Sequence, residues 1–165
     1  MAAGKDKALF GDRVVALNRR ARHEYDLGDA YEAGMQLIGS EVRALRVHGG
    51  DLSDAWVDIT RDGQAVVKGM RIPTLDHAAF GHDETRPRKL LLHAYEIERL
   101  RATVERERMT IVATKCYFKN GRAKLEIALA RGKKQYDKRQ SLKERDAKRE
   151  AYDAIREGKT RGGNR

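Results

Sequence analysis

The sequence predicts a mainly β domain, a closed or nearly closed barrel with two or three short helices, followed by a polar C-terminal tail. Short apolar runs recur with turn signals between them from about Asn18 onward, and two of these turns have the residues of tight β-hairpins. Large apolar side chains become sparse after residue 131, which separates the tail from the domain. Because closing a sheet into a barrel hides its strand edges, many short strands in one domain favour closure.

Two hairpin turns support this prediction most directly. Asp62-Gly63 lies in AWVDITRDGQAVVKGMRI, between runs rich in Val, Ile and Trp, and Asp-Gly can take the positive φ angles of a tight turn. Asn120-Gly121 lies in TIVATKCYFKNGRAKLEIALA, after a strand-like run that ends at Phe118. Apolar residues alternate along the strand that follows, at Ala123, Leu125, Ile127 and Leu129. The second hairpin is therefore expected to have one buried face and one partly solvated face.

Two helices are expected between the strands. In GSEVRALRVHGG, the hydroxyl of Ser40 is expected to cap a short helix that Gly49-Gly50 ends. A second helix is expected from about Ala94 to Arg108, because apolar residues recur there at helical spacing, at Ile97, Leu100 and Val104. These elements favour a five- or six-stranded barrel of oligonucleotide-binding (OB) type. An open α+β sandwich built from the same elements is the alternative.

The chain has three predicted parts. Its 165 residues suit one domain with its own core and one appendage. Residues 1–17 show no clear period and are interpreted as a flexible N-terminal arm, residues 18–131 as the barrel, and residues 132–165 as a basic tail.

The charge is positive and unevenly distributed. The formal net charge is +10 and the pI is about 9.9, which favours polyanionic partners such as nucleic acid. From Arg131 to Arg165 there are 13 basic and 6 acidic residues, a net of +7, which leaves 22 basic and 19 acidic residues, a net of +3, for the rest. Most of the excess positive charge therefore lies in the tail.

The tail is expected to be disordered alone and to become helical against a partner. Its sizeable apolar residues are too few and too widely spaced to form a core stripe: Tyr136, Leu142, Tyr152 and Ile155. Ser141 followed by Glu144 matches a capping box, and Glu144 with Lys148 is a favourable i,i+4 pair, so helix propensity is present.

No metal site, cofactor or catalytic site is expected. Cys116 is the only cysteine, which rules out an intrachain disulfide and a cysteine-rich zinc site. Five histidines are present, but the spacing of His77 and His82 does not place two ligands on one helix face, and no H-E-x-x-H motif occurs. Neither a G-x-x-x-x-G-K-S/T phosphate loop nor a G-x-S-x-G motif is present.

The expected location is the cytoplasm. The apolar runs fall short of the roughly 18 residues that span a bilayer, and the first residues contain no signal-peptide pattern. A single cysteine fits a reducing compartment, and no membrane association is expected.

Three polar stretches are candidates for RNA contact. LNRRARHEY places Arg19, Arg20 and Arg22 beside His23 and Tyr25, although a solvated strand edge is the alternative. HDETRPRKLLLH mixes basic residues with three leucines, of which Leu91 is able to meet a base, unless all three enter the core. GKKQYDKR offers Tyr136 for stacking and a set of cations for phosphates, Lys133, Lys134, Lys138 and Arg139, with a solubilising tail as the alternative.

Five sequence blocks, taken in order, resemble one known family: ALNRRARHEY, YEAGMQLIGSEVRALR, TRPRKLLLH, YFKNGRAKLEIALARGKK, and YDKR followed by KERDAKRE. They are similar to the SsrA-binding protein (SmpB) family of bacterial trans-translation over residues 16 to about 157. The resemblance implies an OB-type barrel that holds the transfer-RNA-like part of transfer-messenger RNA and brings it to a ribosome stalled without a stop codon. It implies a binding protein and not an enzyme.

The resemblance also implies site residues. The family's RNA-binding positions correspond to Glu32, Leu91 and Lys124, and the flanking positions in matching motifs are Asn18, Arg20, Arg22, His23 and Lys89. A carboxylate at Glu32 has to accept hydrogen bonds from base or ribose groups or orient a neighbouring cation, because phosphate would repel it.

For the tail, the resemblance implies entry into the decoding centre and the empty messenger channel of the ribosome. Its tagging motif corresponds to Asp137, Lys138 and Arg139, with Lys133 and Lys134 just before it. The family position before the motif is often His, whereas this chain has Tyr136. Either ring is able to stack on a base, but only an imidazole is able to act by protonation.

The partners implied are transfer-messenger RNA, the small-subunit decoding centre and messenger channel of a stalled ribosome, and elongation factor Tu with the charged RNA, with the protein acting as a monomer. A generic OB-fold RNA-binding or ribosomal protein is the alternative among binding proteins. An RNA-processing enzyme that uses His23 with Tyr25 or Glu24 as acid and base is the alternative from another class.

Overall fold

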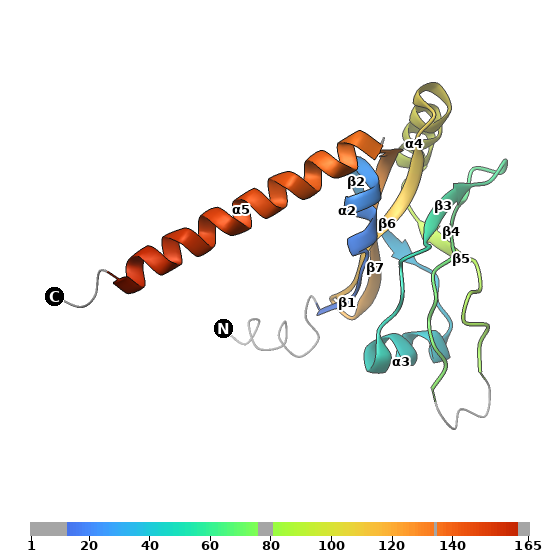
Figure 1. Ribbon diagram of the computed structural model, residues 1–165. Helices are drawn as coiled ribbons and strands as arrows, with labels where there is room; N and C mark the ends of the chain where they lie inside the picture. The colour runs from blue at the N-terminus through green and yellow to red at the C-terminus, as the bar shows by residue number, and fades with distance from the viewer. Residues whose placement is uncertain (1–12, 76–80, 134, 162–165) are drawn as a thin grey trace, which may run out of the picture. The chain divides into compact units, whose positions relative to one another are not determined.

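The computed structural model describes residues 13–75, 81–133 and 135–161 (Figure 1). The chain divides into two compact units, residues 1–132 and residues 133–165. We call them the body and the tail and describe each by itself.

The body is built on a sheet of seven antiparallel strands. The hydrogen-bonded order is β1-β6-β3-β4-β5-β2-β7, and β6 also pairs with β7. The prediction of a mainly β fold is confirmed. The strand bounds are β1 Arg13–Leu17, β2 Tyr25–Met35, β3 Trp56–Ile59, β4 Ala65–Lys68, β5 Arg88–Leu91, β6 Thr110–Lys119 and β7 Arg122–Gly132. β1 begins at Arg13, within the stretch that the sequence assigned to the N-terminal arm.

Both predicted hairpins are confirmed. Asp62-Gly63 lies between β3 and β4, where Gly63 has a φ of 79°. Asn120 and Gly121 join β6 to β7 with φ angles of 52° and 76°. Positive φ at both central residues is the geometry of a tight I′ turn, which Asn120-Gly121 therefore forms. At Asp62-Gly63 only Gly63 has a positive φ, so the tight turn predicted there is wrong, although the hairpin itself is present.

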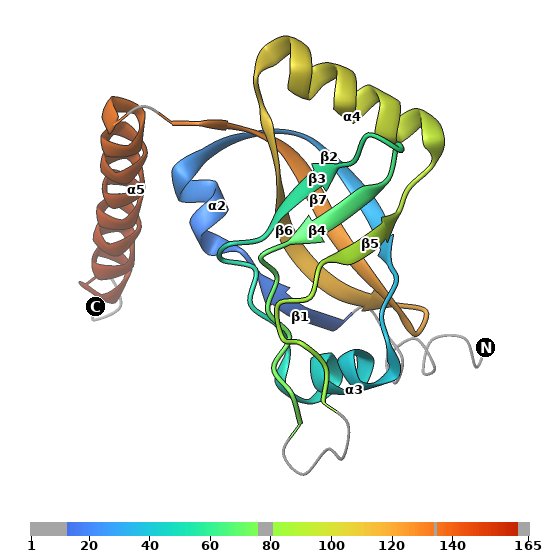
Figure 2. The ribbon, with the colours of Figure 1, turned by 90° about the vertical axis from the view of Figure 1, so that its right-hand side faces the viewer.

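Four helices lie among the described residues: α2 Arg19–Glu24, α3 Gly39–His48, α4 Ala94–Glu107 and α5 Gln135–Arg161. Within the body, α4 lies at one end of the strands and α3 at the opposite end (Figure 2). The predicted helix near residues 94–108 is confirmed. The short helix α2 was missed, because RRARHE shows no apolar period and buries only Ala21.

The start of α3 differs from the prediction. Ile38 is the N-cap residue, so the expected capping by Ser40 is wrong. The Ser40 hydroxyl instead donates to His82 Nδ1 over 3.1 Å, while His82 Nε2 donates to the Ile72 carbonyl over 2.9 Å. Gly49 ends the helix as predicted, with a φ of 73° and its N–H bonded to the Leu45 carbonyl.

The core fills the inner side of the strands. The alternating residues of β7 point inward as predicted, and they pack against inward residues of β6 such as Ile111 and Cys116. Leu45 of α3 and Leu100 of α4 close the core from the helices and are fully buried.

A buried ionic network ties α3 to β5. Glu41 and Arg88 are both fully buried, and the Glu41 carboxylate accepts hydrogen bonds from Arg88 and from the partly exposed Arg86. Arg88 Nη1 also donates to the Met70 carbonyl over 2.8 Å. Burial is the strongest single influence on Glu41 and favours its neutral form, but the bonds from Arg88, Arg86 and the Ile38 amide outweigh it and lower the pKa of Glu41.

The tail contains α5, a helix of 27 residues. It begins at Gln135, so the helix start that the Ser141–Glu144 capping box indicated is wrong. Leu142, Tyr152 and Ile155 are exposed on it, which agrees with a segment that has no core of its own. No helix in the described part of the chain is long and apolar enough to cross a membrane.

Candidate nucleic-acid interface

The structure brings Glu32, Leu91 and Lys124 together on the outward side of four neighbouring strands, β5-β2-β7-β6. Gly34 of β2 is paired with Leu91 of β5 on one side and with Lys124 of β7 on the other. Lys124 is in turn paired with Tyr117 of β6. Because alternate strand residues point the same way, Glu32 lies on the same side as Gly34. We call this surface the outer face, defined by Glu32, Gly34, Leu91, Tyr117, Lys119 and Lys124.

Glu32 is held in a small polar network on the outer face. The Tyr117 hydroxyl donates a hydrogen bond to Glu32 Oε2, and Lys119 Nζ lies 3.4 Å from the same oxygen. The Tyr117 bond lowers the pKa of Glu32, and the positive charge of Lys119 adds to the effect. Oε1 of Glu32 accepts no hydrogen bond from the described residues, which leaves one carboxylate oxygen for a donor outside the protein.

The ring of Tyr117 also faces a cation. Lys115 Nζ lies 5.1 Å from the centre of that ring, on the strand that carries both residues. Tyr117 and Lys119 were not among the predicted site residues. Their signal was the alternation of the predicted hairpin, in which Cys116 and Phe118 point inward and their neighbours therefore point outward.

Leu91 is the apolar part of the outer face. Its side chain is 56% exposed, whereas Leu90 is buried and Leu92 is half-buried, so the interpretation that all three leucines enter the core is wrong for Leu91. Gly34 makes room for it, because a Cβ placed on Gly34 would lie 3.2 Å from Leu91 Cβ. Leu91 and Lys124 both line a hollow of about 270 Å³, and Phe118 lines it as well. An exposed apolar side chain beside a cation suits a nucleotide, which has an apolar base face and an anionic phosphate.

Asn18, one of the predicted flanking residues, has a buried side chain that bonds inside the body. Its Nδ2 donates to the carbonyls of Leu52 and Ala113 over 2.9 and 2.8 Å, and its Oδ1 accepts from the Ala21 amide over 3.0 Å. This arrangement caps α2 and ties it to β6.

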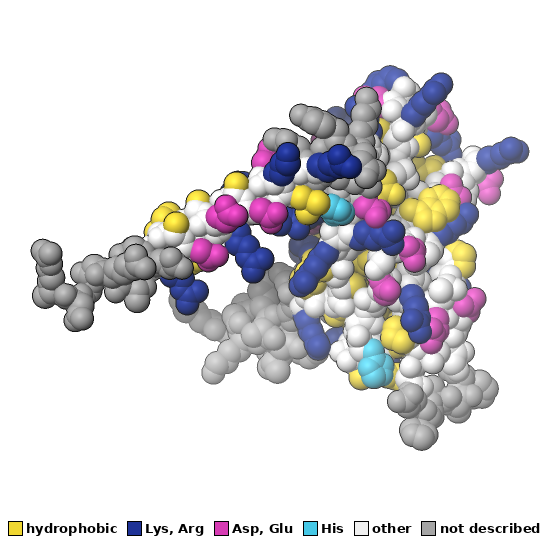
Figure 3. All heavy atoms as spheres, in the orientation of Figure 1, with side chains coloured by type: hydrophobic (Ala, Val, Ile, Leu, Met, Phe, Trp, Pro, Cys, Tyr) yellow, Lys and Arg dark blue, Asp and Glu magenta, His cyan; other side chains and the backbone are white. Residues whose placement is uncertain are grey.

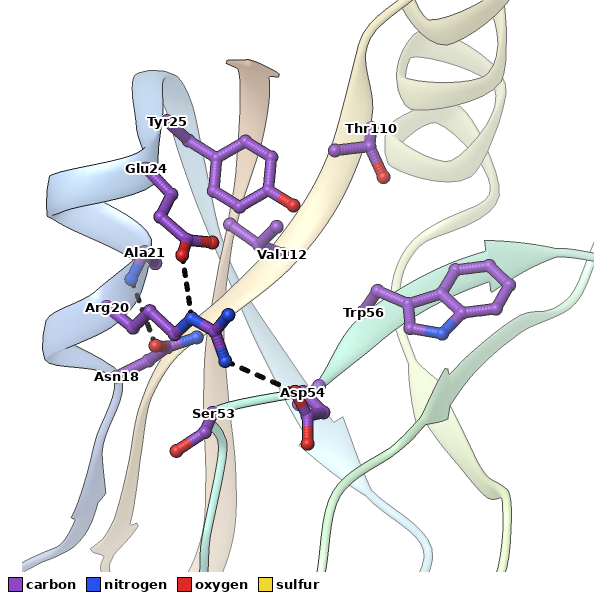
Figure 4. A pocket seen from close by; sticks show the side chains of 11 residues that line it. Asn18, Arg20, Ala21, Glu24, Tyr25, Ser53, Asp54, Trp56, Thr110 and Val112 are labelled. Carbon is purple, nitrogen blue, oxygen red and sulfur yellow. Dashed lines mark hydrogen bonds and ion pairs between the residues drawn. The ribbon is translucent and has the colours of Figure 1, made fainter. Parts of the chain in front are cut away.

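Arg20 lines a second hollow, of about 300 Å³, between α2, β3 and β6 (Figure 4). Its Nε donates to Glu24 over 2.8 Å, and its Nη1 lies 3.7 Å from an Asp54 carboxylate oxygen. Trp56 lies across the hollow from Arg20, and Tyr25 contributes a second aromatic ring beside Glu24. The Arg20 guanidinium is thus engaged by two carboxylates, and a ligand phosphate would have to compete with them.

The other predicted residues of the body lie on its surface. Arg22 and Lys89 are exposed, and His23 is half-exposed. Around α2, Lys and Arg side chains are interspersed with Asp and Glu side chains (Figure 3). The structure therefore separates the predicted strip into a buried cap, Asn18, a hollow at Arg20, and surface positions at Arg22 and His23.

Of the predicted tail residues, Lys133 is half-buried and Arg139 is exposed. The side chains of Lys134, Tyr136, Asp137 and Lys138 lie outside the described part of the structure.

Cys116 and Glu24, two of the titratable groups in the body, are held in its own structure. Among residues 13–75, 81–133 and 135–161, no three His, Cys, Asp or Glu side chains are grouped to hold a metal ion. Burial raises the pKa of the Cys116 thiol to about 12, so this cysteine stays protonated at neutral pH. Glu24, considered as a general base, is ion-paired with Arg20. His77 lies outside the described residues.

Comparison with known proteins gives one consistent result. A model of the SmpB protein family matches residues 15–157. An SsrA-binding protein from Sorangium cellulosum is 52% identical over 146 residues, which are 88% of this chain and 90% of the relative. One from Zymomonas mobilis subsp. mobilis is 43% identical over 159 residues, 95% of this chain and 99% of the relative.

A solved structure is also similar to this chain. It is described as "tmRNA-SmpB: a journey to the center of the bacterial ribosome". The TM-score is 0.61 and the identity 38%, over 75% of this chain and 85% of the other. The similarity therefore extends to three-dimensional structure as well as to sequence.

Proposed function

Because this chain belongs to the SmpB family, we propose that it is an RNA-binding factor that carries transfer-messenger RNA to stalled ribosomes for trans-translation. The observation that carries the proposal is the family match over residues 15–157, which includes most of the body and most of the tail. The description of the similar solved structure names tmRNA-SmpB and the bacterial ribosome, which supports the same partners.

We infer that the body is a closed barrel of OB type. Its hydrogen-bonded strand neighbours run from β6 through β3, β4, β5, β2 and β7 and return to β6. A sheet whose last strand pairs with an earlier one hides most of its edges. That leaves side-chain surfaces, and not open strand edges, as the means of binding RNA.

The outer face is the proposed RNA-binding surface of the body. Lys124 supplies a cation for phosphate, Leu91 an exposed apolar side chain for a base or ribose, and Glu32 an ionised acceptor for a base amino or ribose hydroxyl group. Lys89, also exposed on β5, flanks this surface. The four side chains together offer charge, apolar contact and a directional acceptor, which structured RNA requires and a plain cationic patch does not provide.

The strip around α2 is a proposed flanking contact. Arg22 and His23 are accessible to RNA on the body's surface, and Arg20 lies at the edge of a hollow with Tyr25 and Trp56. For Asn18 the buried bonding favours an indirect role, in which its side chain fixes the position of α2 and thereby of Arg20 and Arg22.

The tail is the proposed ribosome-probing element. Its cations are attracted to the phosphates of an RNA-walled channel. Its apolar residues Leu142, Tyr152 and Ile155 are exposed and too few to form a core. In this proposal the helix α5 is stable only against a partner, because its apolar residues are too few to support it alone. Asp137, Lys138 and Arg139 act at the decoding centre, with Lys133 and Lys134 on the approach, and Tyr136 stacks on a base there.

The remaining partners follow from the same function. The factor acts as a monomer in the cytoplasm, where ribosomes are, and joins elongation factor Tu on the charged RNA. Its contribution is positioning, with no bond made or broken by the protein.

A competition experiment tests the proposal against a generic OB-fold or ribosomal protein. The full chain is titrated with a labelled transfer-RNA-like domain of transfer-messenger RNA and competed with unlabelled single strands of equal length. We expect the structured RNA to be retained at a large excess of single strand. Equal competition by the single strand would contradict the proposal, because stacking platforms without shape recognition bind both.

A further inference from the structure

An exposed pair of stacked aromatic rings lies at the start of α4. The rings of His93 and Tyr95 are 5.5 Å apart between centroids, with an angle of 11° between their planes. Tyr95 is 68% exposed, and His93 is exposed as well. Since His93 covers one face of the Tyr95 ring, the other face remains available for a further flat group.

The pair is held on a rigid element. His93 precedes α4, and its backbone N–H donates to Glu96 Oε2 over 3.1 Å, which fixes the first turn. Ile97 and Leu100 anchor the helix in the core, and Arg101 Nη2 donates to the Thr60 carbonyl over 2.7 Å. Tyr95 is two residues from Ile97, about 200° around a helix of 3.6 residues per turn, so it points away from the core.

The pair continues the outer face. Antiparallel pairing sets Leu91 of β5 opposite Gly34 of β2, and the same register carries the chain after Leu91 toward the Glu32 end of β2. Leu91 is exposed at the end of β5, and His93 follows it by two residues. A bound RNA that covers Leu91 and Glu32 therefore meets the His93 and Tyr95 rings at its border.

The charges around the rings favour an anion. Both nearby carboxylates are engaged within the body, Glu96 by the His93 amide and Glu98 by Arg101 at 3.5 Å. Lys89 and Arg99 are exposed and form no ion pair within the described part of the chain. Arg99 stands one helical turn from Tyr95, and Lys89 is on the strand that leads to the pair.

We propose that His93 and Tyr95 form an aromatic platform on which an unpaired base of the bound RNA stacks, with Lys89 and Arg99 beside its phosphates. The inference rests on the proposed RNA-binding function and adds a base contact to it. The polar outward neighbours Glu98 and Arg99 suit a nucleotide, which brings its own charge, better than the apolar centre of a protein interface.

The test uses full-length protein and a transfer-RNA-like RNA probe, with three single variants. Tyr95→Ala removes the ring, Tyr95→Phe keeps it without the hydroxyl, and Tyr152→Ala removes an equally exposed tyrosine, 69% exposed, from the tail. We expect Tyr95→Ala to weaken binding by about 5-fold to 100-fold, the range of one stacked base, and the other two to stay near the parent affinity. The slope of affinity against salt should not change, because no phosphate contact is removed.

Each other outcome has a distinct meaning. If Tyr95→Ala binds RNA as tightly as the parent while Lys124→Ala binds it weakly, the platform proposal is overturned and the proposed function still holds. Equal losses in Tyr95→Ala and Tyr95→Phe indicate a hydroxyl hydrogen bond in place of stacking, which also overturns it. Failure of the parent protein to prefer this RNA removes the proposed function and the platform together. Circular dichroism of each variant verifies that the fold is intact.

Discussion

Tyr117 and Glu32 are joined by a hydrogen bond across the outer face, although 85 residues separate them in the sequence. The bond fixes one oxygen of a carboxylate that would otherwise sample several rotamers in water. Since the same oxygen also lies near Lys119, the carboxylate is ionised and oriented before any RNA arrives.

Replacing Tyr117 with Phe should therefore alter the pH dependence of RNA binding. The Tyr117 bond lowers the pKa of Glu32, so the ionised acceptor is present above that pKa and is lost as pH falls through it. In the variant the pKa moves up toward the ordinary value of about 4.3, and binding should decline at a higher pH than in the parent. At neutral pH we expect a loss of about 2-fold to 10-fold.

The measurement is RNA affinity as a function of pH together with carboxyl NMR of Glu32. Tyr152→Phe, which removes a hydroxyl from the tail, is the control and should leave the profile unchanged. If Glu32 titrated at the same pH in the parent and in Tyr117→Phe, Tyr117 would not be the residue that positions this carboxylate.

Replacing Glu41 with Gln should destabilise the body strongly. The change leaves the fully buried Arg88 without its anionic partner, and breaking a buried ion pair from one side costs about 3–5 kcal/mol. Urea unfolding at neutral pH measures the loss. Glu84→Gln is the control, because the Arg71–Glu84 pair is solvent-accessible and should contribute little.

The same network predicts the response to acid. The pKa of Glu41 is lowered in the folded state, so its contribution is fully present above the unfolded value of about 4.3 and is lost as pH falls through the folded pKa. The parent should lose stability steeply below about pH 4, and Glu41→Gln should show a shallower slope there. Parallel slopes in the two proteins would exclude Glu41 as the source.

Leu91→Ala and Leu90→Ala should affect different properties, although the residues are adjacent: the first should weaken RNA binding and the second should lower stability. Leu91 is exposed, so its truncation should leave stability nearly unchanged and weaken RNA binding by about 5-fold to 30-fold through lost apolar contact. Leu90 is buried, so its truncation should lower the free energy of unfolding by about 2–5 kcal/mol. Thermal unfolding and RNA titration of the two variants check this. Unchanged RNA affinity in Leu91→Ala would remove Leu91 from the interface.

Removing everything after Lys134 should separate binding from rescue. The truncated protein keeps the whole body, so its affinity for transfer-RNA-like RNA at physiological salt should be nearly that of the full chain. Tagging of proteins on stalled ribosomes should be abolished, because the element proposed to enter the channel is gone. Loss of most of the RNA affinity on truncation would contradict this division of labour.

Local sequence signals predicted the parts of the fold that depend on neighbouring residues. Asn120-Gly121 carries its turn geometry in two residues, and the apolar period of α4, at Ile97, Leu100 and Val104, extends over about two helical turns. α2 has six residues and one buried side chain, too little for a period to emerge.

Local sequence signals could not predict contacts between segments that lie far apart in the sequence. Arg88 stands in a stretch that resembles a surface RNA contact, and its burial depends on an anionic partner, Glu41, that is 47 residues away in the sequence. Tyr117 had no marker other than its outward position in a predicted strand. For Glu32, Leu91 and Lys124 the family resemblance supplied the residues, and the strand register supplied the reason that they share one face.

The chain contains a single tryptophan, and it stands at the hollow that Arg20 lines. Trp56 is partly exposed there, with Lys68 Nζ 5.4 Å from its ring centre. Its intrinsic fluorescence is therefore a built-in reporter for that hollow. Quenching or a spectral shift on adding RNA would signal occupancy next to α2, without any dye attached to the protein.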